Sequence, residues 1–72
     1  MEFKDRLRIA RTRAGFSMAD LGSKLRTPVS AQSINKYEKG GMMPSSGTLH
    51  DLSIALNVSL DVLMKGQVVE LE

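Results

Sequence analysis

The sequence predicts an all-α domain of five short helices, and three observations support this class. Apolar residues recur at three- and four-residue steps in successive segments, and most of these segments follow a serine or precede a glycine or asparagine. No segment alternates polar and apolar residues for long enough to form a convincing strand. The chain has 72 residues and no cysteine, so its stability depends on one apolar core and on well-capped helices.

The first helix is expected over residues 3–14, and Gly15 is expected to end it. Ile9 points away from the apolar side of this helix and is expected to be exposed. The apolar stripe at helical spacing consists of Phe3, Leu7, Ala10 and Ala14.

The second helix is expected from about Met18 to Leu25. Ser17 stands before it and Asp20 follows three residues later, so each side chain can accept a hydrogen bond from a free backbone amide at the helix start. Gly22 is a poor helix former, and its position between Leu21 and Leu25 indicates that another backbone packs closely against it.

The third helix is expected over Ala31–Lys39, because Pro28 prevents the second helix from continuing and Ser30 can cap a new one. Gly40 supplies the residue that ends it in a left-handed conformation. Ile34 and Tyr37 form its apolar face. The opposite face carries Gln32, Asn35, Lys36 and Lys39.

A loop rich in glycine, serine and proline precedes a fourth helix, expected from about Thr48 to Leu56 and ended by Asn57. A fifth short helix follows Ser59 as its cap and ends near Lys65. We therefore expect one domain over residues 1–66, and we expect residues 67–72 to form a tail or the start of a linker to a further domain. The apolar faces of all five helices predict one core, formed by Leu7, Leu21, Ile34, Tyr37, Leu49, Leu52, Leu56 and Leu63.

The formal net charge of +2 is small, but the charges are unevenly distributed. Residues 1–26 hold seven Lys and Arg against three Asp and Glu, whereas residues 27–72 hold three against five. The basic part is either an ordinary solvated surface or an electrostatic footprint for phosphates.

Residue types that carry catalysis or bind metals are sparse. His50 is the only histidine, and neighbouring Asp51 does not share its helix face, so a catalytic pair is not expected. One histidine and scattered carboxylates do not form a metal site, so no metal, no cofactor and no enzymatic activity are expected. The longest apolar runs are too short for a membrane span, and together with the missing cysteines this predicts a cytoplasmic protein that does not bind membranes.

Over residues 3–66 the chain resembles the lambda-repressor-like, or XRE-type, helix-turn-helix regulators of bacteria and phages. The motifs that carry the resemblance are Leu7-Arg8-Ile9-Ala10-Arg11, Gly15-Phe16-Ser17, Leu21, Ser33-Ile34-Asn35-Lys36-Tyr37-Glu38-Lys39-Gly40, Pro44, Leu49, and the run from Leu52 to Leu63. In that family the second helix crosses the DNA backbone and the third enters the major groove. Two features depart from the family pattern: residues 26–29 make the link between these helices about two residues longer than usual, and Met18 stands where a glutamine that touches phosphate is frequent.

The resemblance and the chemistry of the third helix together predict which residues meet DNA. Amide side chains can pair with adenine and lysine can donate to guanine, so the expected base contacts are Gln32, Ser33, Asn35 and Lys36. The expected phosphate contacts are Arg11, Ser17 and Lys24, which match family positions near the backbone, and Lys39, which lies near the edge of the polar face of the third helix. Arg11 is expected at the exposed end of the first helix, with its guanidinium available to a phosphate.

The resemblance implies a sequence-specific DNA-binding transcriptional regulator, in this family most often a repressor or an autoregulator. Its partner would be double-stranded DNA, with a two-fold symmetric operator and at most a weak homodimer of this domain. The alternative is a protein-interaction module that keeps the fold but has little DNA affinity, which the near-neutral charge and the Gly41-Met42-Met43 loop would suit.

Overall fold

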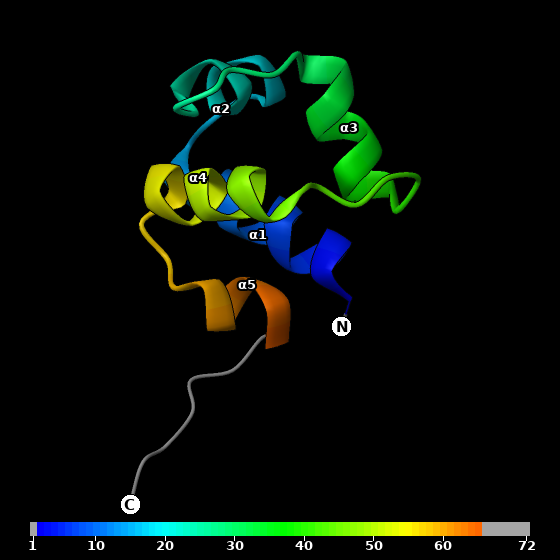
Figure 1. The fold of residues 1–72 in the computed structure, drawn as a ribbon, viewed down its shortest axis with the longest axis vertical. Helices are drawn as coiled ribbons and strands as arrows, with labels where there is room; N and C mark the ends of the chain where they lie inside the picture. Colours follow the sequence, from blue (N-terminus) through cyan, green and yellow to red (C-terminus); the bar gives the residue numbers. More distant parts are fainter. Residues whose placement is uncertain (1, 66–72) are drawn as a thin grey trace, which may run out of the picture.

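The computed structural model describes residues 2–65, which form five α-helices and no strand (Figure 1). The expected tail, residues 67–72, lies outside the described residues. The helices are α1 (Phe3–Ala14), α2 (Met18–Lys24), α3 (Ala31–Lys39), α4 (Ser46–Leu56) and α5 (Leu60–Lys65). The predicted all-α class with five short helices is therefore confirmed.

The predicted helix ends are confirmed by their hydrogen bonds. The Ser17 hydroxyl accepts from the amide of Asp20, and the Asp20 carboxylate accepts from the amide of Ser17, which is the capping box expected at the start of α2. The Ser30 hydroxyl caps α3 and that of Ser59 accepts from the amide of Val62 in α5. The left-handed residues that end three helices are Gly15, Gly40 and Asn57, with φ of 78°, 80° and 56°.

Two helix boundaries differ slightly from the prediction. Helix α2 ends at Lys24, and Leu25 follows it in an extended conformation. Helix α4 begins at Ser46, two residues before the expected Thr48, because the hydroxyl of Ser45 accepts from the amide of Thr48 and so caps an earlier start.

The structure builds one core, as predicted, although one of its expected members is missing. Leu49 lies in the first turn of α4 and is only half-buried, so its inclusion in the core was wrong. Periodicity gives the direction in which a side chain points, but not whether another helix covers it at that height along the axis. The buried apolar residues are Leu7, Leu21, Leu25, Ile34, Tyr37, Leu52, Leu56 and Leu63.

The helices are arranged so that α2 and α3 lie at one end of the molecule and α5 at the other, with α1 and α4 between them (Figure 1). Helix α3 packs against both α2 and α1, and α1 also contacts α4 and α5. Helix α3 is therefore held in place by α1 and α2, and it lies away from α5.

The long link between α2 and α3 is held in place by two hydrogen bonds. The amide of Val29 donates to the carbonyl of Gly22 at 3.1 Å, and that of Thr27 donates to the Asp51 carboxylate of α4 at 3.2 Å. A Cβ atom at Gly22 would lie 2.3 Å from the carbonyl oxygen of Val29. The close backbone approach predicted at Gly22 is thus confirmed, and it joins α2 to the segment that leads into α3.

Candidate nucleic-acid interface

The candidate interface is centred on the outer face of α3, which carries Gln32 and Lys36 one helical turn apart. Both side chains are exposed, while Ile34 and Tyr37 on the opposite side are buried in the core. Neither polar side chain bonds to another described residue. Their amide and ammonium groups therefore remain available to an external partner.

Ser33 and Asn35, also predicted to contact bases, are half-buried on α3. The hydroxyl oxygens of Ser33 and Ser30 lie 3.2 Å apart, and the Ser30 hydroxyl also accepts from the Ser33 amide. The hydroxyl of Ser33 is therefore already engaged in the helix cap. The structure thus brings the four predicted residues together on one helix but exposes Gln32 and Lys36 more fully than the other two.

Three of the residues expected to meet phosphates have exposed side chains. Lys39 lies in the last turn of α3, and Ser17 caps the start of α2. Lys24, at the end of α2, holds its ammonium nitrogen 5.0 Å from the centre of the Phe16 ring, a cation–π arrangement. The aromatic contact restricts where the charge of Lys24 can reach.

Arg11 does not have the exposed position expected for it. Its Nε donates to Oε2 of Glu38 at 2.6 Å and an Nη atom donates to Oε1 at 3.1 Å. Its other Nη donates to the carbonyl of Phe16 at 2.8 Å. The side chain is 15% exposed and that of Glu38 is 2% exposed. Because an ion pair with α3 takes up this guanidinium, the expectation of an exposed arginine was wrong.

The ion pair also affects the titration of the arginine. The hydrogen bond from Arg11 to Glu38 raises the pKa of Arg11 above its ordinary value, and the charge of Glu38 acts in the same direction, against a lowering by burial. A group whose pKa is raised by folding stabilises the fold fully below its unfolded pKa and loses this effect only as pH rises through the folded pKa. For arginine, the pH range in which this stabilisation is lost is strongly alkaline. Arg11 therefore stays positively charged near neutral pH.

Sequence reasoning missed Glu38 as a partner of Arg11. The available signal was the position of Glu38 on α3, four residues after buried Ile34 and next to buried Tyr37. A carboxylate at such a buried position needs a partner of opposite charge. Finding that charge required knowing which side of α1 faces α3. Helical periodicity does not supply this relationship between two elements.

Within residues 2–65 no group of three or more His, Cys, Asp or Glu side chains is arranged to hold a metal ion. In the same part of the chain no helix has the length and apolar character required to cross a bilayer. The outer face of α3 carries exposed hydrogen-bonding groups together with the positive charges of Lys36 and Lys39.

Comparisons with known proteins agree with this architecture. A family model described as helix-turn-helix matches residues 7–63. The chain is similar to the crystal structure of the P22 c2 repressor in complex with a synthetic operator: the TM-score is 0.86, the sequences are 31% identical, and the match covers 93% of this chain and 98% of the repressor chain. It is also similar to the solution structure of the P22 c2 repressor DNA-binding domain, with a TM-score of 0.86, 29% identity and coverage of 100% and 92%. The chain matches no curated protein sequence.

Proposed function

This chain belongs to the helix-turn-helix family, and we propose that it is a sequence-specific DNA-binding transcriptional regulator that acts as a repressor. The observation that carries the proposal is the outer face of α3, where Gln32 and Lys36 are exposed and bond to no other described residue. The likeness to a repressor whose structure was solved with operator DNA supports the same conclusion. No feature of the described residues favours an enzymatic role.

In the proposed complex α3 lies in the major groove, and its exposed side chains reach base edges. The amide of Gln32 can both donate to and accept from adenine, and the ammonium of Lys36 can donate to the acceptors of guanine. Asn35 and Ser33, which are half-buried, contribute at the borders of the contact. Buried Ile34 and Tyr37 hold the helix from behind.

Phosphate contacts fix the position of the domain on the duplex. We assign them to Lys39, to Ser17 at the start of α2, and to Lys24. Arg11 is omitted from this set because its guanidinium is bound to Glu38 and to the carbonyl of Phe16. Its role in the proposed complex is to position α3 relative to α1.

One domain of this size covers only half of a two-fold symmetric operator, so we propose that two copies bind adjacent half-sites. The domain alone is proposed to be a monomer or a weak dimer. The exposed large apolar residues support this state, because Met42, Met43, Ile54 and Leu60 are distributed over three segments of the chain.

Selection of bound duplexes from a random pool, followed by sequencing, tests the function. The expected result is one enriched motif with two-fold symmetry, bound with an affinity that falls steeply as salt is raised. Recovery of random sequences at every salt concentration would contradict sequence-specific recognition. If the protein does not bind DNA but binds a protein partner with an affinity that does not depend on salt, the domain is a protein-interaction module.

A further inference from the structure

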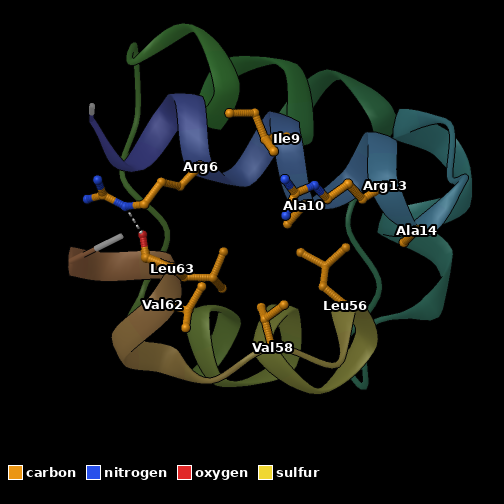
Figure 2. A pocket seen from close by; sticks show the side chains of 9 residues that line it. All are labelled: Arg6, Ile9, Ala10, Arg13, Ala14, Leu56, Val58, Val62 and Leu63. Carbon is orange, nitrogen blue, oxygen red and sulfur yellow. Dashed lines mark hydrogen bonds between the residues drawn. The ribbon is translucent and has the colours of Figure 1, made fainter. Parts of the chain in front are cut away.

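A groove on the side of α1 that faces α5 has no part in the proposed DNA complex. It lies between α1 on one side and α5 with the end of α4 on the other (Figure 2). Its volume is about 420 Å³. The residues that line it are Arg6, Ile9, Ala10, Arg13, Ala14, Leu56, Val58, Val62 and Leu63.

The groove combines an apolar floor with charge of one sign. Seven of its nine lining residues are aliphatic, the other two are arginines, and none is acidic. Ile9, which was expected to be exposed, is instead half-buried, and it lines this groove. A site of this composition favours a ligand that is apolar along its body and negatively charged at one end.

The two arginines differ in what they already bind. Arg6 donates to the carbonyl of Leu63 at 2.7 Å and to that of Met64, so it caps the end of α5. Arg13 is exposed and bonds to no other residue among those that the structure describes. In Figure 2 the side chain of Arg13 extends back over the groove towards Ala10, so its guanidinium stands above the apolar floor.

We propose that this groove binds a small amphipathic carboxylate, with its hydrocarbon chain on Val58, Val62 and Ile9 and its carboxylate on Arg13. The volume falls within the roughly 300–1,000 Å³ of small-molecule sites. A stable protein interface, by contrast, takes roughly 20–30 residues on each side, whereas nine residues line this groove. Guanidinium groups bind carboxylates through paired N–H donors, so we expect the negatively charged end of the ligand to be a carboxylate.

The site is separate from the face of α3 and does not depend on the function proposed for that face. Helix α3 lies at one end of the molecule and α5 at the other (Figure 1). Helix α1 contacts both, binding Glu38 of α3 through Arg11 and lining the groove with Ile9 and Arg13. Ligand binding can therefore be measured with or without DNA, and a failure of one proposal leaves the other intact.

The test is a nuclear magnetic resonance titration of the full chain with sodium octanoate, kept below its micelle-forming concentration. We expect saturable shifts of the methyl signals of Val58, Val62 and Ile9. Arg13→Gln should weaken octanoate binding about fivefold, because Arg13 is exposed and solvent screens its charge pair with the carboxylate. Octanol, which has the chain but no charge, should bind the parent and the Arg13→Gln chain equally.

Two further variants serve as controls. Arg8→Gln removes an exposed arginine of α1 that does not line the groove, and it should leave octanoate affinity unchanged. Ala14→Leu adds bulk at an exposed position on the groove wall, and it should reduce binding of both octanoate and octanol. The melting temperature of each variant checks that the fold is kept.

Three outcomes would overturn the proposal. The first is the absence of saturable shifts in the groove, and the second is equal octanoate affinity in the parent and the Arg13→Gln chain. The third is concentration-dependent self-association that Ala14→Leu abolishes, which would assign the groove to a second copy of this chain.

Discussion

The guanidinium of Arg11 donates to both carboxylate oxygens of Glu38, and this pair links the C-terminal part of α1 to α3. A third bond from Arg11 reaches the carbonyl of Phe16 and fixes the turn between α1 and α2. One arginine therefore orients the helix that carries Gln32 and Lys36 and also the segment that leads into α2. Since the carboxylate is almost fully buried, it depends on this partner.

Replacing Arg11 with methionine should lower the free energy of unfolding by about 3 kcal/mol, because the buried carboxylate of Glu38 is then unpaired. Urea denaturation followed by circular dichroism measures the loss. Arg8→Met is the matched control on α1, since Arg8 is exposed, and it should change stability by less than about 0.5 kcal/mol.

The double variant Arg11→Met/Glu38→Met separates pairing from packing. It leaves no buried charge, so it should be more stable than Arg11→Met alone. If the loss of unfolding free energy in the double variant equals the sum of the losses in Arg11→Met and Glu38→Met, the two side chains are not energetically coupled. In that case α3 is positioned by apolar packing only.

Gly22→Ala should destabilise the domain by roughly 1–3 kcal/mol, because the added methyl group would collide with the backbone of Val29 rather than with a movable side chain. Gly47→Ala is the matched control within a helix. Nothing lies within 4 Å of the position that its Cβ atom would take, so alanine should stabilise α4 by about 0.5–1 kcal/mol. Thermal melts of both variants test the contrast, and equal effects at the two glycines would refute the close approach of α2 to the link.

The local features of the fold were predictable because each depends on a few neighbouring residues. Ser17 with Asp20 specifies a helix start, and Gly40 specifies a helix end, whatever the rest of the chain does. Features that depend on how two helices pack against each other were not predictable from the sequence. The pairing of Arg11 with Glu38 belongs to this second kind.

The same distinction explains the candidate site. The exposure of Gln32, Lys36 and Lys39 was predicted correctly because buried Ile34 and Tyr37 mark the opposite side of α3, although Asn35 on the predicted outer face is half-buried. The half-buried position of Ile9 was not predicted, because it depends on how α1 packs against the other helices, and helical periodicity does not supply that arrangement. A helical wheel shows which residues share a face, but it does not show which neighbour the face meets.

Leu52→Ala should cost roughly 2–5 kcal/mol, because the side chain is fully buried in the core and its removal leaves a cavity. In a domain this small that loss can unfold most of the molecules. Leu49→Ala, one turn earlier on α4, is the control: the residue is half-buried and outside the core, so its cost should be clearly smaller. Equal losses in thermal melts would place Leu49 in the core after all.

The last prediction separates base contacts from phosphate contacts on the proposed DNA surface. Gln32→Ala and Lys36→Ala should each cost roughly 1–3 kcal/mol on the selected motif and relax the preference at one base position, because side chains in the groove distinguish base pairs. Lys39→Ala should weaken binding to all duplexes and reduce the slope of log affinity against log salt by about one, without altering the motif, because a phosphate contact carries no sequence information. Selection with each variant and titrations at several salt concentrations measure both effects. If Lys39→Ala changes the motif while Gln32→Ala and Lys36→Ala leave it intact, α3 does not read the bases and the proposed orientation on DNA is wrong.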